Sequence, residues 1–188
     1  MRTIHGTTLT THRGVTLIEL CTALAILAIL IGLAAPSFAQ LQQNATRRAA
    51  MDDFWHAIFL ARSEAIKRNS VVSLCKSSDG TNCTNASPDW AGGWLVFENL
   101  DHDDPAQRDS NEPVLRFYEG HRGIHITTTA GRQTFSYHPN TQGSANGTVV
   151  FCDNRGPSAA RAIIISHTGR PRQSQRDANN RPLACPLN

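Results

Sequence analysis

The chain begins with a short polar stretch and then becomes apolar almost without interruption. Residues 15–35 read VTLIELCTALAILAILIGLAA and carry a single charge, that of Glu19. As a helix, this segment would extend roughly 32 Å, enough to cross the apolar core of a bilayer. We therefore expect a transmembrane helix over residues 15–36. A cleavable secretory signal is the alternative, which Pro36 disfavours because it follows directly after the candidate cleavage site Ala34-Ala35.

Beyond this segment, apolar residues recur at steps of three and four, with charged residues between them. The residues with this spacing are Met51, Phe54, Ile58, Ala61 and Ala65. Such spacing is typical of a helix with one buried face. We therefore expect one long helix over about residues 16–69, whose amphipathic second half, residues 37–69, packs on a globular head.

After residue 70 the pattern changes to short runs of β-branched and aromatic residues, separated by Gly, Pro, Asn and Asp. The runs that we expect to be strands are 71–76, 93–98, 114–119, 124–129, 133–137, 148–152 and 162–167. Residues 70–188 are thus expected to form a mostly antiparallel β head. The predicted fold class is α+β, with a long N-terminal helix packed on an antiparallel sheet.

Composition excludes two broad classes, and charge is distributed unevenly. Of the 188 residues, 40% are hydrophobic and 18% charged, which excludes a highly charged disordered chain and a membrane protein with many spans. Residues 79–119 contain two Lys or Arg against nine Asp or Glu. Residues 120–188 contain eight arginines against two acids, so this last third is a candidate site for anions.

The junction between the polar start and the apolar segment carries a specific motif. Gly14 precedes Val15-Thr16-Leu17-Ile18-Glu19, and a carboxylate within an apolar span costs about 2.5–3.5 kcal/mol, which indicates a partner for Glu19. The motif resembles the processing site of type IV pilins and pseudopilins, with Val15 where that family most often has Phe. The resemblance implies that a prepilin peptidase removes a leader, residues 1–14, by cutting after Gly14. It also implies N-methylation of Val15 and pairing of Glu19 with a neighbouring subunit's N-terminal amine during assembly.

The head resembles one subgroup of that family. The stretch Trp90-Ala91-Gly92-Gly93-Trp94-Leu95-Val96-Phe97 and the acidic loop after it resemble FimT/GspH-type minor pseudopilins, as do the later stretches GTVVFCDNRG and IIISHTGRPR. The resemblance covers nearly the whole chain. It implies a single-pass inner-membrane protein with a periplasmic head, extracellular once assembled in a pilus, and other major and minor pilins as partners. Taken alone, Trp90 and Trp94 are typical of a packed core.

The acidic loop, residues 99–104, raises the question of calcium binding. It reads Asn-Leu-Asp-His-Asp-Asp, so oxygen ligands are abundant. It lacks the glycine and the distal bidentate glutamate of an EF-hand loop. We therefore expect a solvated acidic turn.

Four cysteines fall in the head and fit an oxidising compartment. They are Cys75, Cys83, Cys152 and Cys185, which permit three disulfide pairings. We favour Cys75–Cys83, which closes a short loop off a strand end. Cys152–Cys185 would then tie a Pro-containing tail to a strand, where loop closure helps most. A zinc site is the alternative, but the sequence has no C-x-x-C pair.

The C-terminal region carries the most informative chemistry. Gly169-Arg170-Pro171-Arg172 follows a predicted strand and turn, and Arg176 and Arg181 come after it. In an extended segment, residues two apart point the same way, roughly 6.6 Å apart. Two guanidinium groups on one face can each grip a phosphate bidentately. Arg122, Arg132, Arg155 and Arg161 are candidates to extend this patch.

The G-R-x-R motif resembles the one that FimT-type pilins of naturally transformable bacteria use to bind DNA, and Gly169, Arg170 and Arg172 match it. The resemblance implies weak, sequence-independent binding to the phosphate backbone. The alternative is that these arginines are ordinary solvated charges, or that they bind the acidic loop of a neighbouring subunit.

The expected function is non-enzymatic. The sequence contains no G-x-S-x-G, H-E-x-x-H or phosphate-loop motif, and no cofactor is expected. We expect a minor type IV pilin that binds extracellular DNA for uptake in natural transformation. The alternative is a structural minor pseudopilin, similar to GspH, that primes a type IV pilus or a type II secretion pseudopilus.

Overall fold

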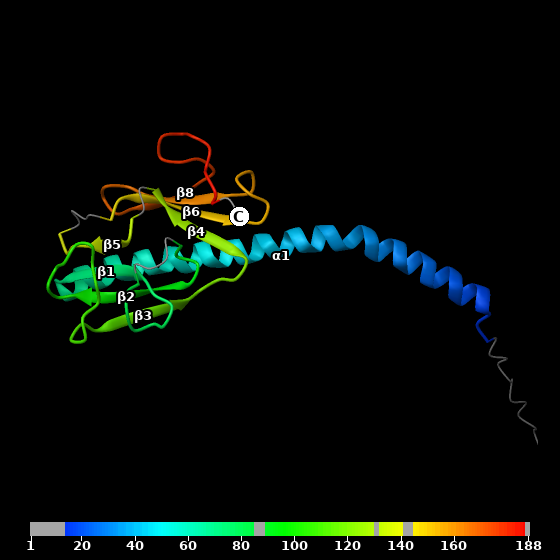
Figure 1. The fold of residues 1–188 in the computed structure, drawn as a ribbon, viewed down its shortest axis with the longest axis horizontal. Coiled ribbons are helices and arrows are strands. Elements are labelled where there is room, and N and C mark those ends of the chain that lie inside the picture. Colours follow the sequence, from blue (N-terminus) through cyan, green and yellow to red (C-terminus); the bar gives the residue numbers. More distant parts are fainter. Residues whose placement is uncertain (1–13, 85–88, 130–131, 141–144, 187–188) are drawn as a thin grey trace, which may run out of the picture. The chain divides into compact units, whose positions relative to one another are not determined.

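The computed structural model describes residues 14–84, 89–129, 132–140 and 145–186, without the side chains of Ala35 and Pro36 (Figure 1). The predicted leader lies outside the described residues, apart from Gly14. The chain divides into two compact units, Met1–Leu41 and Gln42–Asn188.

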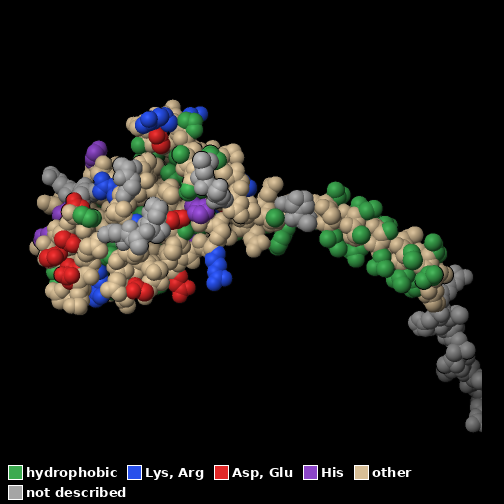
Figure 2. All heavy atoms as spheres, viewed as in Figure 1, with side chains coloured by type: hydrophobic (Ala, Val, Ile, Leu, Met, Phe, Trp, Pro, Cys, Tyr) green, Lys and Arg blue, Asp and Glu red, His purple; other side chains and the backbone are tan. Residues whose placement is uncertain are grey.

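Helix α1 spans Leu17–Arg68, within one residue of the predicted helix at either end. The backbone N–H of Glu19 donates to Oγ1 of Thr16 at 3.3 Å, so Thr16 caps the first turn. In the first unit the apolar side chains are exposed, as Figure 2 shows along this part of the helix. One window of this helix has a mean hydropathy of 2.5, so α1 is long and apolar enough to cross a membrane.

The second half of α1 buries one face, as the three- and four-residue spacing predicts. The buried apolar residues on this face are Ala50, Met51, Phe54, Ala57, Ile58, Ala61 and Ala65. The helix ends before Asn69, whose φ of 51° leaves the helical region, and the N–H of Ser70 donates back to the carbonyl of Ala65. All five apolar positions predicted from the spacing are therefore confirmed as buried.

In the part of the chain that the structure describes, eight strands form two antiparallel four-stranded sheets. The first sheet has the order β3-β2-β1-β5, with β1 at Val71–Lys76, β2 at Gly93–Asn99, β3 at Val114–Glu119 and β5 at Thr134–Tyr137. The second has the order β4-β6-β7-β8, with β4 at Ile124–Thr128, β6 at Gly147–Asp153, β7 at Arg161–Ile165 and β8 at Pro171–Ser174. The predicted α+β fold and the seven predicted strands are confirmed. Strand β8 is additional: it is short and polar, and its first residue, Pro171, lies on a sheet edge, where proline is tolerated.

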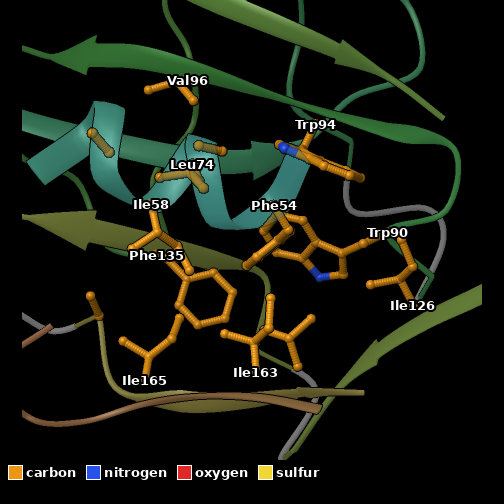
Figure 3. Close-up of a cluster of buried hydrophobic side chains, with 14 of the residues drawn as sticks. Phe54, Ile58, Leu74, Trp90, Trp94, Val96, Ile126, Phe135, Ile163 and Ile165 are labelled. Atoms are coloured by element: carbon orange, nitrogen blue, oxygen red, sulfur yellow. The ribbon is translucent and has the colours of Figure 1, made fainter. Parts of the chain in front are cut away.

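The core of the head forms where α1 meets both sheets, around Phe54 (Figure 3). The centroid of the Phe54 ring lies 5.3 Å from that of Trp94 in β2 and 5.9 Å from that of Phe135 in β5. It also lies 5.6 Å from Trp90 and 6.0 Å from Phe151 in β6. One helical side chain thus joins the two sheets, and Trp90 and Trp94 are core residues, both fully buried.

A buried ion pair fixes the helix to the end of β6. Nη1 of Arg47 lies 2.8 Å from Oδ2 of Asp153, and Nε of Arg155 donates to the other carboxylate oxygen at 2.9 Å. Both arginines also donate to Oδ1 of Asn44, each at 2.9 Å. The hydrogen bonds from Arg155 lower the pKa of Asp153, although burial opposes them. The carboxylate is therefore charged in the folded head at neutral pH.

We predict that Asp153→Asn destabilises the head by about 3–5 kcal/mol at about pH 7, because it leaves the buried Arg47 charge without its partner. Folding lowers the pKa of Asp153. The ionised carboxylate therefore stabilises the head at any pH above its pKa in the unfolded chain, about 3.9. This stabilisation is lost as the pH falls through the lower pKa of the folded head. In urea unfolding, the difference in free energy of unfolding between wild type and variant should therefore become smaller below about pH 4. Asp52→Asn, at an exposed position on α1, is the control. A difference in free energy of unfolding that does not change with pH would contradict the stabilising role of the ionised Asp153 carboxylate.

Candidate nucleic-acid interface

The predicted arginine motif lies in a hairpin that joins β7 to β8. The N–H of Gly169 donates to the carbonyl of Ser166 at 2.8 Å, and the N–H of Ser166 donates to the carbonyl of Arg170 at 3.0 Å. Residues 166–169 thus form the turn predicted at this point. Of the described strands, β8 pairs with β7 alone and so forms one edge of the second sheet. The hairpin therefore presents Arg170 and Arg172 at a sheet edge.

Both the backbone conformation and the neighbouring side chain at position 169 favour glycine over residues with a Cβ atom. Its φ is +70°, a region that residues with a side chain rarely adopt. A Cβ atom at this position would lie 2.8 Å from the ring of Tyr137, which is itself buried. Burial raises the pKa of Tyr137, and the positive charge of Arg62 partly offsets this. The turn that precedes the two arginines is therefore fixed against a buried aromatic ring.

Arg170 and Arg172 are exposed, and neither guanidinium group makes a hydrogen bond or an ion pair with any residue that the structure describes. Arg172 lies opposite Ile164 of β7. Arg170 immediately precedes β8 and lines a hollow together with residues of α1. Both guanidinium groups are thus available to an anionic ligand.

Arg176 and Arg181 lie in the loop after β8, and their guanidinium groups are already engaged. The guanidinium of Arg176 donates to the carbonyl of Asn180 at 3.0 Å, and that of Arg181 forms a 3.3 Å ion pair with Asp177. The backbone N–H of Arg181 also lowers the pKa of Asp177. Figure 2 shows basic side chains over this loop, with an acidic side chain beside them. The ion pair with Asp177 offsets the charge of Arg181, whereas Arg176 keeps its full charge with one N–H donor engaged.

The other arginines considered from the sequence mostly have structural roles. Arg155 binds Asp153, and Arg161 donates to the carbonyls of Ala159 and Ala160. Arg132 lies over the ring of Phe135, with its guanidinium carbon 5.8 Å from the ring centroid. Arg122 is exposed.

The structure instead adds Arg62 of α1, which lines the same hollow as Arg170. These two arginines are far apart in the sequence. Only the packing of the hairpin beside the helix brings them to one hollow, so no local sequence signal identifies Arg62.

The second disulfide holds the C-terminal loop on the sheet. Cys152 of β6 is bonded to Cys185, and Cys75 to Cys83, which is the pairing favoured from the sequence. Leu183 is buried against Val150 and Cys152. The loop carrying Arg176 and Arg181 is thus attached to the same sheet as Arg172, and all four head cysteines are in disulfides rather than in a zinc site.

The acidic loop is largely exposed at Leu100, Asp101, His102 and Asp104, as expected of a solvated turn, and buried residues at its ends hold it. Glu112 is buried, and its carboxylate accepts the N–H groups of Leu100 at 2.6 Å and Asp109 at 2.9 Å. Asn99 is also buried and accepts the N–H of His102. Glu112, whose hydrogen bonds hold the loop, lies well beyond it in the sequence, so its part in the loop was not predicted. Burial also raises the pKa of Asp103 in this loop.

Comparison with known proteins places the fold. Residues 50–169 match the family model described as type II transport protein GspH. The pilin-like protein PilA1 of Thermus thermophilus is 38% identical over 91 residues, which are 46% of this chain and 48% of PilA1. This chain therefore spans about half the length of that curated relative.

Two crystal forms of the type IV minor pilin FimU of Pseudomonas aeruginosa share the fold. The TM-score is 0.53 in both cases, at 19% and 20% identity. The likeness covers 68% of this chain and 91% or 87% of FimU. The family match ends at Gly169, so the arginines of β8 and the following loop lie beyond it.

We predict that Gly169→Ala destabilises the head more than Gly123→Ala does. Both glycines have a positive φ, at +70° and +77°, so each substitution should cost about 1–2 kcal/mol of backbone strain. A Cβ at Gly123 meets open space, whereas one at Gly169 meets the Tyr137 ring. Urea unfolding of both variants measures the difference. Equal losses of stability would show that the Tyr137 contact does not constrain the turn.

Proposed function

The chain belongs to the GspH family, and from this we propose that it is a non-enzymatic minor pilin that binds extracellular DNA for uptake in natural transformation. The observation that carries the DNA-binding part is the pair Arg170 and Arg172. Both are exposed, Arg172 on the edge strand β8 and Arg170 immediately before it, and neither guanidinium is bound to any described residue. A rigid turn at Gly169 holds them in place.

The chemistry of this pair favours phosphate as the ligand. A guanidinium group offers several N–H donors in a planar fork, which matches two oxygens of one phosphate. Phosphates recur along a nucleic-acid strand, so an exposed strand edge with two such groups can engage neighbouring phosphates. Contacts of this kind carry no base information, so binding should be sequence-independent and sensitive to salt.

The proposal includes the membrane stage of the protein. Residues 1–14 would be the leader, cut by a prepilin peptidase after Gly14 so that Val15 becomes the methylated terminus. Residues 15–36 would span the inner membrane and later enter the filament core among other major and minor pilins. Residues 37–69 and 70–188 would then form the amphipathic half-helix and the periplasmic head, which reaches the outside in the assembled pilus. The exposed apolar side chains of α1 support this stage.

We predict that the double variant Arg170→Ala/Arg172→Ala weakens DNA binding and reduces its dependence on salt. If each arginine neutralises one phosphate, the slope of log K against log salt should become less steep by about 2 on duplex DNA. The measurement is fluorescence anisotropy of a labelled duplex between about 50 and 200 mM salt. The full chain is used, held in phosphatidylcholine nanodiscs.

The matched control is Arg48→Ala/Arg122→Ala, which removes the same charge from two other exposed positions. This control should retain most of the wild-type slope. If both double variants weaken binding equally, the effect is one of net charge and the proposed site is wrong. If the wild type does not bind at low salt, the DNA-binding function itself is wrong.

A structural minor pseudopilin is the second candidate, and the match to the GspH family favours it. On this view the essential group is Glu19, which lies exposed in the first turn of α1. Its carboxylate is favoured there by the helix dipole, but no described side chain neutralises it.

We predict that Glu19→Gln prevents incorporation into filaments, because a neutral amide cannot form an ion pair with the amine of a neighbouring subunit. The measurement is the amount of the chain in sheared filaments, with Glu64→Gln as the control. Normal incorporation of Glu19→Gln would contradict the assembly role. Arg170→Ala/Arg172→Ala should leave incorporation unchanged if these arginines serve DNA binding alone.

A further inference from the structure

A hollow of about 450 Å³ lies between α1 and the arginine hairpin, within the unit Gln42–Asn188. The helix contributes Phe59, Arg62, Ser63 and Ile66, which share one face because they are three, four and seven residues apart. The hairpin contributes Arg170 and Pro171. The volume falls within the range of sites that hold small molecules or parts of larger ligands.

The hollow combines an exposed aromatic ring with two positive charges. Phe59 is 48% exposed and Ile66 is 51% exposed, although both are large apolar residues. The ring of Trp55 lies 5.8 Å from that of Phe59 and supports it from the side. The guanidinium groups of Arg62 and Arg170 make no hydrogen bond or ion pair with the described residues. The site therefore combines an exposed aromatic ring with two cationic side chains.

We propose that this hollow receives an unpaired base of bound DNA, which stacks on Phe59 while Arg62 and Arg170 contact the flanking phosphates. This inference rests on the proposed DNA-binding function and names the form of DNA that is preferred. Aromatic rings beside basic groups are the common means of binding single strands without reading sequence. A paired duplex keeps its bases inside the stack, so only single-stranded DNA, or a strand end, can use the Phe59 ring.

The position of Arg170 favours a nucleotide over an apolar segment of another protein. Arg170 belongs both to the hollow and to the phosphate-binding edge formed with Arg172, so the two surfaces are continuous. A strand whose phosphates follow β8 would bring its bases to the hollow beside it. An apolar protein segment would fill the space near Phe59 and Ile66 but would leave both arginines without an anionic partner.

The test compares two probes of equal charge: a labelled oligothymidylate and an abasic strand of the same length. Binding is measured on the full chain in phosphatidylcholine nanodiscs. Wild type should bind oligothymidylate at least about fivefold more tightly than the abasic strand, since stacking one base on an aromatic ring contributes about 1–3 kcal/mol. Phe59→Ala should reduce this ratio to about one and leave abasic binding unchanged, whereas Phe59→Trp should preserve it.

Leu100→Ala is the matched control, because Leu100 is also about half exposed, at 47%, but lies in the acidic loop. It should leave the ratio unchanged.

A second readout is tryptophan fluorescence, since Trp90 and Trp94 are fully buried and Trp55 lies beside Phe59. Oligothymidylate, but not the abasic strand, should alter this fluorescence.

Three results would overturn the inference in distinguishable ways. Equal wild-type affinity for both strands would show that DNA binds without stacking, and the proposed function would remain intact. Phe59→Ala could instead leave the ratio of oligothymidylate to abasic-strand affinity unchanged and abolish self-association of the chain seen in wild type. That result would assign the hollow to a protein contact. Failure of wild type to bind any strand or duplex at low salt would remove the DNA-binding function as well.

Discussion

The Phe54 ring holds the head together, because rings from both sheets meet on it. Trp94 and Phe135 reach it from the first sheet, and Phe151 reaches it from the second. Among the described strands, none of one sheet pairs with a strand of the other, so the helix is the common surface on which each sheet buries its apolar face. The position of every strand relative to the helix follows from this packing, including that of the hairpin that carries the arginines.

The arginine hairpin depends on the core at one point. Tyr137, at the end of β5 in the first sheet, packs against Gly169, which lies in the turn between β7 and β8 of the second sheet. The turn is therefore supported by the opposite sheet as well as by its own strands. Through the same packing, Arg62 of the helix and Arg170 of the hairpin line one hollow. A basic surface on a short edge strand thus acquires a defined geometry from the buried aromatic groups below it.

Local patterns in the sequence predicted most of the fold. The spacing of Met51, Phe54 and Ile58 identified the buried helix face, and runs of β-branched residues identified seven strands. Strand β8 lacked such a signal because it is polar and begins with proline, and its pairing with β7 is what makes it a strand. The division into two sheets depends on which strands pair, which single-sequence patterns do not encode.

The candidate site was predicted in part. Arg170 and Arg172 were identified by a local motif, and their exposure is consistent with that hypothesis. Arg62 and Phe59 were not singled out, because they lie in the helix more than a hundred residues before the motif. Arg155 was a candidate to extend the arginine patch, but it pairs with the buried carboxylate of Asp153. Asp153 also pairs with Arg47 of the helix, a residue that only the fold brings near it.

The outer side of β8 has a consequence for solubility. An edge strand offers unpaired backbone groups that another chain can extend, which is a common route to aggregation. Pro171 removes one N–H donor from this edge, and the charges of Arg170 and Arg172 repel a second copy that approaches in the same way. We therefore expect the two arginines to disfavour edge-to-edge association of separate heads. Under the proposed function, the same two charges would attract a phosphate-rich strand to this edge.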